Sequence, residues 1–175
     1  MNTRVASNVW TKLFITTLGF ALLAVSARLY IPLEPVPITF QPLAVMVLGL
    51  CFPKWPARSA GAFYVLMGFA GVPYLFTAAV GWATAGYLVG FVFAIWAMTA
   101  LRDLLDERSF KSLLLLNCVG VLCIYVPGVL WLSSGLGLKS AIQLGVLPFI
   151  LPGLFKSLIL AGIVRFLRAG RPVAR

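Results

Sequence analysis

Histidine is absent from this chain of 175 residues, and there are only four acidic residues, Glu34, Asp103, Asp106 and Glu107. A Ser-His-Asp triad, an HExxH zinc site and a carboxylate dyad therefore lack their parts. The sequence contains no GxxxxGK[ST] motif, so the chain has no P-loop with which to hydrolyse ATP. We therefore expect neither an enzyme nor a bound metal or cofactor.

Charged residues are scarce as well. They make up 10% of the chain, against 62% hydrophobic residues and a mean hydropathy of +1.04. Soluble domains are about one-quarter charged. The composition predicts an integral membrane protein with a single domain, residues 1–175. The three cysteines, Cys51, Cys118 and Cys123, lie in apolar segments without CxxC spacing, and we interpret them as small hydrophobic residues.

Long apolar runs alternate with charged or Pro/Gly-rich segments. This pattern predicts an all-α integral membrane fold, a bundle of six transmembrane helices. Segments between the spans on the non-cytoplasmic side are predicted to be loops, at 32–37, about 71–84 and about 134–146. The approximate spans are 12–31, 38–53, 57–71, 84–101, 112–133 and 147–168.

The basic residues predict an orientation. With six spans both termini share one side of the membrane, and 11 of the 14 Lys and Arg residues then lie on that side. By the positive-inside rule this side is cytoplasmic, as expected for a multi-pass protein of the inner (plasma) membrane. Basic loops facing anionic lipid also account for the net charge of +10, so no nucleic-acid partner is needed. The three basic residues outside this cytoplasmic group are Arg28, Lys139 and Lys156.

The first predicted span has one alternative interpretation. The segment "TKLFITTLGFALLAVSA" has a basic flank, an apolar centre and a small-x-small end at Val25 and Ala27, like a cleavable signal. Cleavage would leave five spans and break the charge pattern.

Lys156 is the most unusual residue of the chain. It lies nine residues before Arg165, which places it about 14 Å deeper in the membrane at about 1.5 Å per residue. A lysine near the midplane costs about 2.5–3.5 kcal/mol, so it is by default a functional site inside the bundle. A ligand anion, an ion pair with Glu34 or loss of its proton would each remove the charge. Pro152 suits the first turn of a helix, and a helix starting there would aim free N–H groups at an anion.

The outer loops and outer helix ends carry further polar candidates. Pro32, Pro35 and Pro37 end the first span and favour an extended loop, which would bring Thr39 and Gln41 to the first turn of the second span. Either these two residues face a ligand, or Thr39 only caps the helix. Tyr87, Asn117 and Tyr125 are polar groups in apolar surroundings, and they either bind a ligand or bond between helices.

Four segments form a recognisable set, in order along the chain: "PLEPVPITFQ" (32–41), "GFAGVPYLF" (68–76), "TAGYLVGF" (84–91) and "GVLPFILPGLFK" (145–156). Together they resemble the BioY family, the biotin-binding S components of energy-coupling-factor transporters.

The resemblance implies six helices with biotin held near the outer side. It further implies partners for uptake, namely a transmembrane coupling subunit and two ATPases. The family's lysine maps onto Lys156, its Thr and Gln onto Thr39 and Gln41, and its Thr-x-Gly-Tyr onto Thr84, Gly86 and Tyr87. We add Tyr74, Asn117 and Tyr125 to the ligand-binding candidates.

The chain departs from the family pattern at several positions. Gly153 stands where the family has an acid three residues before the lysine, and Ala83 and Ala85 replace a proline and a glycine. The ligand is therefore biotin or another small anionic nutrient. A membrane enzyme lacks an acid or histidine to activate Ser157, which does not face its neighbour Lys156 on a helix. A purely structural bundle leaves Lys156 unexplained.

Overall fold

Helices form nearly all of the structure. The computed structural model describes residues 8–71 and 82–169. Two short 3-10 turns, Trp82–Thr84 and Arg102–Leu104, flank the helix Ala85–Leu101. A hairpin whose two strands have two residues each follows the first helix. The elements in these ranges are α1 (Val9–Arg28), β1 (Tyr30–Ile31), β2 (Ile38–Thr39), α2 (Gln41–Cys51), α3 (Lys54–Phe69), α4 (Ala85–Leu101), α5 (Phe110–Leu136), α6 (Leu138–Gly145) and α7 (Leu147–Ala169).

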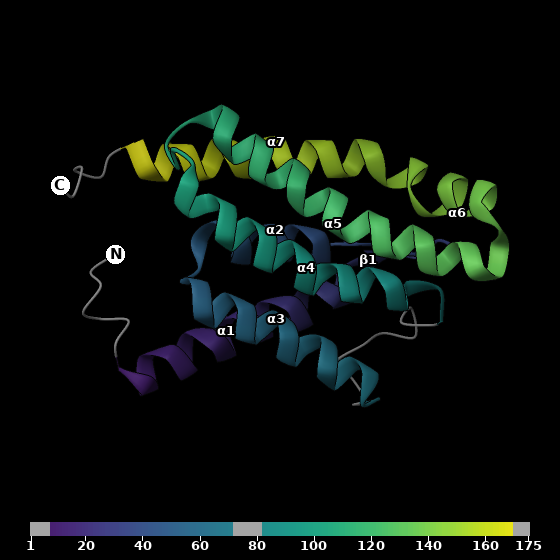
Figure 1. The fold of residues 1–175 in the computed structure, drawn as a ribbon, viewed down its shortest axis with the longest axis horizontal. Coiled ribbons are helices and arrows are strands. Elements are labelled where there is room, and N and C mark those ends of the chain that lie inside the picture. Colours follow the sequence, from purple (N-terminus) through teal and green to yellow (C-terminus); the bar gives the residue numbers. More distant parts are fainter. Residues whose placement is uncertain (1–7, 72–81, 170–175) are drawn as a thin grey trace.

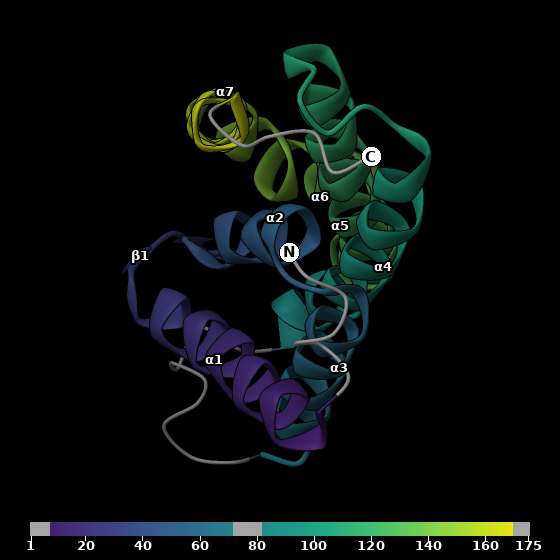
Figure 2. The same cartoon turned by 90° about the vertical axis from the view of Figure 1, so that its left-hand side faces the viewer.

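The long helices run roughly along one axis of the molecule. Figure 1 shows that α1 begins at the same end of the molecule at which α7 ends. Seen along that axis, α2 lies at the centre, with α1 and α3 on one side and α4, α5 and α7 around the other (Figure 2). The short helix α2 therefore contacts most of its neighbours and joins the two sides of the bundle.

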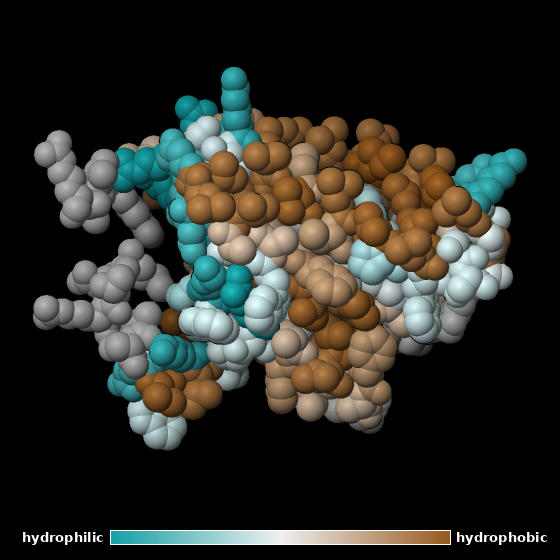
Figure 3. Space-filling model, in the orientation of Figure 1, coloured by the Kyte–Doolittle hydropathy of each residue, from teal (hydrophilic) through white to brown (hydrophobic). Residues whose placement is uncertain are grey.

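The surface has the apolar character of a membrane protein. Among the described residues, four stretches are long and apolar enough to cross a membrane: Val9–Arg28, Ala85–Leu104, Phe110–Leu136 and Leu138–Ala169. Figure 3 shows a broad hydrophobic middle, with hydrophilic residues gathered towards the two ends. The predicted membrane class is confirmed, and the chain is a multi-pass integral membrane protein.

The loop predicted at 134–146 is wrong, because most of this segment is helix α6. Gly137 separates α5 from α6 with φ of 76°, a backbone conformation that glycine adopts without strain. Ala141 and Gly145, four residues apart, are buried, while Lys139 and Gln143 are exposed. This one-sided pattern is that of a short amphipathic helix.

A helix start at Pro152, considered from the sequence as an anion site, is not found, and the predicted span 147–168 matches helix α7. α7 begins at Leu147, and Pro152 lies inside it. Pro148 takes the first-turn position that the prediction gave to Pro152. Interior prolines are tolerated in membrane helices, and Pro127 of α5 is a second example. No set of free helix-terminal N–H groups therefore lies one turn before Lys156.

The proline-rich segment after α1 forms the tip of the hairpin. Tyr30 pairs with Thr39 and Ile31 with Ile38 in antiparallel register. The Thr39 side-chain oxygen accepts a hydrogen bond from the Gln41 N–H at 3.3 Å, so Thr39 does help to cap α2. This hairpin carries the chain directly onto the N-terminus of α2.

Two arginines fix the other end of α2. One guanidinium nitrogen of Arg102 donates to three carbonyl oxygens at the C-terminus of α2, those of Gly49, Leu50 and Phe52, at 2.9–3.1 Å. Arg168 of α7 donates to the Leu50 carbonyl as well. Glu107 pairs with both arginines, at 3.3 and 3.2 Å. Carbonyls that a helix end leaves unpaired are thereby satisfied.

Candidate functional site

A pocket lies where the N-terminus of α2 meets α4, α5 and the start of α7. The described residues around it leave about 50 Å³, room for a few water molecules. Its walls are mostly apolar, with several hydroxyl groups and one amide. The lining residues are Val36, Pro37, Thr39, Gln41, Pro42, Thr84, Tyr87, Leu88, Phe91, Ile124, Tyr125 and Phe149.

The first residue of α2 brings an amide to the pocket. Gln41 is buried, and its side-chain nitrogen donates to the Tyr64 hydroxyl of α3 at 2.7 Å. That bond fixes the amide plane and leaves the side-chain oxygen of Gln41 as an acceptor. An N–H group of a ligand is its natural partner.

Two tyrosines bring hydroxyl groups from α4 and α5. The Tyr87 hydroxyl donates to the Gly145 carbonyl at 2.9 Å and so ties α4 to α6. The Tyr125 hydroxyl lies 3.4 Å from the Phe149 carbonyl, a long and weak hydrogen bond. Tyr125 can therefore exchange this bond for one to a ligand at little cost, whereas Tyr87 has a structural bond to lose.

Lys156 lies beside the pocket, on α7. Its ammonium nitrogen donates to the Thr39 carbonyl at 2.9 Å and lies 4.6 Å from the centre of the Phe40 ring. An ammonium group has three N–H donors, so this contact leaves two for a ligand. Both neighbours are neutral. The lysine is thus positioned by the backbone next to Gln41, but its charge is not balanced there.

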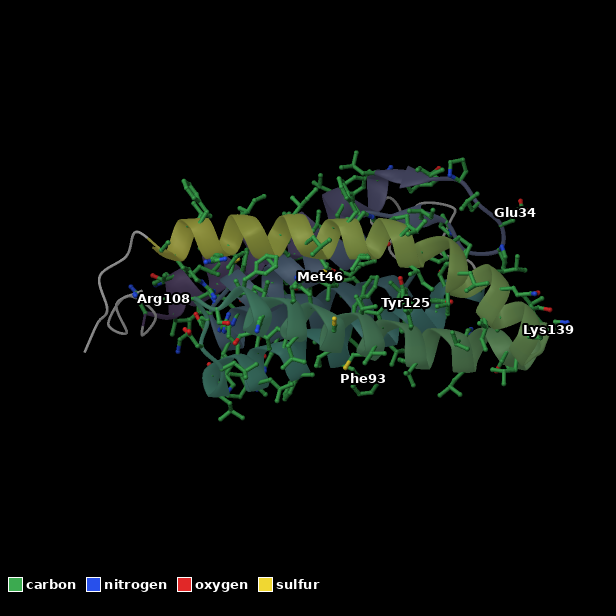
Figure 4. All side chains as sticks on the ribbon, turned by 90° about the horizontal axis from the view of Figure 1, so that it is seen from above. Glu34, Met46, Phe93, Arg108, Tyr125 and Lys139 are labelled. Atoms are coloured by element: carbon green, nitrogen blue, oxygen red, sulfur yellow. The ribbon has the colours of Figure 1, made fainter. Side chains whose placement is uncertain are left out.

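The ion pair between Lys156 and Glu34, one of the three alternatives considered from the sequence, is not formed. Within residues 8–71 and 82–169, which include all four acids, no carboxylate lies within 4 Å of the lysine nitrogen. Glu34 is exposed at the hairpin tip. In Figure 4 it lies at the same end of the molecule as Lys139, while Arg108 lies at the opposite end and Tyr125 between them.

The structure brings together six of the nine predicted site residues. Thr39, Gln41, Thr84, Tyr87 and Tyr125 line the pocket, and Lys156 joins them through Thr39. Tyr74 lies outside the described residues.

Gly86 and Asn117 lie elsewhere. A Cβ atom at Gly86 would meet the Pro127 carbonyl at 2.5 Å and the Trp131 side chain, so this glycine lets α4 approach α5. Asn117 is fully buried and donates to the Ser157 carbonyl at 3.1 Å, joining α5 to α7. Neither residue lines the pocket, and both make contacts between helices.

Sequence reasoning did not single out the apolar part of the lining. Hydropathy does not separate a residue that faces a pocket from one that faces lipid. The sequence did contain one sign of these residues: all of the apolar lining residues except Pro42 and Ile124 lie within the four segments that resemble the BioY family. These apolar lining residues are Val36, Pro37, Pro42, Leu88, Phe91, Ile124 and Phe149.

The comparisons with known proteins agree on one family. The family model described as "BioY family" matches residues 1–172 of the chain. The chain belongs to the BioY family. A probable biotin transporter BioY of Pyrococcus horikoshii is 32% identical over 82% of this chain and 87% of its own length. The biotin transporter BioY of Thermotoga maritima is 33% identical over 81% and 86%. The family resemblance inferred from the four segments is thus confirmed.

A solved structure shares the fold. The crystal structure of the S-component for biotin from an ECF-type ABC transporter aligns with a TM-score of 0.76. The alignment covers 98% of this chain and 96% of that chain, at 22% identity. The chain therefore shares the fold of that S component.

Proposed function

We propose that this protein captures biotin from outside the cell and delivers it inward as the S component of an energy-coupling-factor transporter. Residues 1–175 form its single substrate-binding domain. Since the chain has no P-loop, ATP hydrolysis comes from partners, a transmembrane coupling subunit with two ATPase subunits. Membership of a family whose curated members are named biotin transporters supports the substrate.

The observation that carries the proposal is the unbalanced ammonium of Lys156 beside a pocket of aromatic and amide groups. Biotin has one carboxylate, an apolar ring system and chain, and a ureido group with N–H donors and a carbonyl acceptor. Small-molecule sites are typically apolar with a few well-placed polar groups. The side chains in and beside the pocket include a partner for each of these groups of biotin.

Each part of biotin has a counterpart. The carboxylate pairs with the two N–H donors that Lys156 does not use on Thr39. One ureido N–H donates to the Gln41 side-chain oxygen, and the ureido carbonyl accepts from the Tyr125 hydroxyl. The rings of biotin pack on apolar side chains of α4 and α5, those of Phe91 and Ile124.

The pocket must widen to hold this ligand. About 50 Å³ is well below the 300 Å³ or more of typical small-molecule sites. We expect the pocket to widen at the weak bond between the Tyr125 hydroxyl and the Phe149 carbonyl, because breaking this bond loosens the start of α7 from α5. We therefore propose that the first turns of α7 move outwards when biotin enters, while the bond from the Tyr87 hydroxyl to the Gly145 carbonyl keeps α6 on α4.

We propose six membrane spans with both termini in the cytoplasm. α1, α4 and α5 are three of them, and α6 continued by α7 is a fourth. α2 and α3 complete the six. With 11 residues, α2 is about 16 Å long, and the hairpin before it extends its path through the membrane.

Binding of labelled biotin to the purified protein tests this function. Wild type should bind biotin, and Lys156→Ala and Lys156→Glu should bind it far more weakly while folding as wild type does. Biotin uptake by cells should require co-expression of the energising subunits, because those subunits hydrolyse the ATP that drives transport. Absence of biotin binding by folded wild type would remove the proposal.

A second candidate is a carrier for another small anionic nutrient. It is favoured by Gly153, which stands where the family resemblance leads us to expect an acid. A Cβ atom there would lie 3.5 Å from the Tyr125 hydroxyl, so an acid at this position would contact the pocket's polar group. Competition of unlabelled vitamins against biotin separates the two candidates.

A further inference from the structure

Arg58 of α3 is a buried arginine away from the pocket. Its Nε donates to the Thr99 hydroxyl at 2.9 Å and its Nη2 to the Trp96 carbonyl at 3.3 Å. The guanidinium carbon lies 4.4 Å from the centre of the Trp96 ring and 5.7 Å from that of Trp55. Two indole rings, one from α3 and one from α4, thus make cation–π contacts with this guanidinium.

This cation has no acidic partner. Within the described ranges no carboxylate lies within 4 Å of Arg58, and the nearby Asp103 is engaged by Lys54 at 3.1 Å. The contacts of Arg58 use Nε and Nη2. Within the described ranges its remaining nitrogen, Nη1, makes no hydrogen bond, so the N–H donors of Nη1 are left for an added acceptor. A buried charge without a counterion normally attracts one.

An apolar groove begins at the same tryptophan. It runs between α4 and α5 on the outer surface of the bundle and measures about 710 Å³. Trp96 forms one end of its lining, and Phe93, Leu122, Val126 and Leu130 continue it. All five side chains are apolar or amphipathic, and the groove's wall carries almost no polar surface. Trp96 therefore touches both the cation and the groove.

We propose that Arg58 and this groove form a binding site for an anionic phospholipid. The phosphate accepts from Nη1 of Arg58, and the exposed rings of Trp55 and Trp96 flank the headgroup. One acyl chain lies in the groove along Phe93 and Val126. Guanidinium groups suit phosphate better than other cations do, and tryptophan is enriched at membrane interfaces.

The position of the site favours a lipid over a soluble anion or a protein. Arg58 is one helical turn from Lys54, whose ion pair with Asp103 belongs to the charged end of the bundle. We propose that this end is cytoplasmic, where the leaflet is rich in anionic lipid. A free anion would use Arg58 but leave the groove empty. A lipid fills both, and the bilayer supplies it at high concentration.

The test compares lipids on the purified protein. Phosphatidylglycerol should raise the melting temperature of wild type by several degrees more than phosphatidylcholine with the same acyl chains, because a ligand that binds the folded state stabilises it. Native mass spectrometry should find retained phosphatidylglycerol. Arg58→Gln should lose the difference between the lipids, and Arg58→Lys should keep part of it. Lys111→Gln, an exposed lysine at the same end, should keep all of it.

A groove variant covers the case in which Arg58→Gln fails to fold. Val126→Trp fills the groove without touching Arg58 and should reduce the retained lipid by several-fold. An equal lipid difference in wild type and Arg58→Gln would overturn the proposal. So would an equal shift from inorganic phosphate, or no difference between the two lipids in wild type. None of these measurements uses biotin, so their failure is separate from failure of the proposed function.

Discussion

Lys156 and Thr39 are 117 positions apart in the chain, and the ammonium of the first donates to the backbone carbonyl of the second at 2.9 Å. This contact fastens α7 to the end of the hairpin at the edge of the pocket. A carbonyl oxygen positions the lysine without neutralising it. An unbalanced cation held by a residue of the pocket lining suits a ligand that carries a carboxylate.

Tyr125 and Tyr87 should differ when each loses its hydroxyl. Tyr125→Phe should weaken biotin binding about 2- to 10-fold, the worth of one hydrogen bond, and leave the melting temperature nearly unchanged. Tyr87→Phe breaks the 2.9 Å bond to the Gly145 carbonyl, so it should lower the melting temperature as well. Calorimetric titration and thermal unfolding check the two effects. Equal losses of stability in both variants would contradict the assignment.

Gly90 should not tolerate even one added methyl group. A Cβ there would lie 2.7 Å from the Cys123 carbonyl and from the Ile124 Cα, both of which are backbone atoms that cannot yield easily. Gly90→Ala should cost about 1–3 kcal/mol of unfolding free energy. Gly162→Ala is the control, since nothing lies within 4 Å of its Cβ position. It should be neutral or slightly stabilising, because alanine favours helix. Chemical unfolding in micelles measures both.

Arg102 should matter far more than the nearby exposed ion pair. Arg102→Met leaves the Gly49 and Phe52 carbonyls at the end of α2 without their side-chain donor, while Arg168 still serves the Leu50 carbonyl, and it should cost about 3 kcal/mol. Lys54→Met breaks only the Lys54–Asp103 pair, whose side chains are 39% and 53% exposed. Such pairs are worth at most about 1 kcal/mol. Similar losses of stability in the two variants would contradict the role given to Arg102.

The proposed orientation predicts which side of the membrane two labelled positions face. Arg108 and Lys139 lie at opposite ends of the molecule (Figure 4). Arg108→Cys and Lys139→Cys are made separately in a variant whose native cysteines are replaced by alanine. In intact cells an impermeant thiol reagent should label position 139 and spare position 108. Labelling in inverted vesicles should reverse this result. Labelling of both positions from one side would refute the six-span topology.

The sequence predicted the membrane class, and most of the polar residues that it singled out lie together, for a physical reason. A hydroxyl, amide or ammonium group inside an apolar run must find a partner, and such groups tend to gather around one another. Thr39, Gln41, Tyr87, Tyr125 and Lys156 accordingly meet at one place. Asn117 followed the same rule but found its partner in Ser157, deeper between α5 and α7.

The same reasoning could not predict which apolar residues line the pocket or which proline occupies the first turn of helix α7. Leu88 and Phe93 are both apolar residues of α4, yet Leu88 is buried at the pocket and Phe93 is 56% exposed on the outer surface. Lipid and protein core are equally apolar, so hydropathy gives no sign of the difference. Pro152 was misplaced because two prolines four residues apart, Pro148 and Pro152, both suit a first helical turn.

The most direct test of the central claim pairs a change in the protein with a matching change in the ligand. Biotin and biotin amide are titrated against wild type and Lys156→Gln. If the lysine holds the carboxylate, wild type should prefer biotin about 10- to 100-fold, as expected for a charge-assisted bond, and Lys156→Gln should bind both ligands alike. Equal affinity of wild type for biotin and its amide would contradict the account.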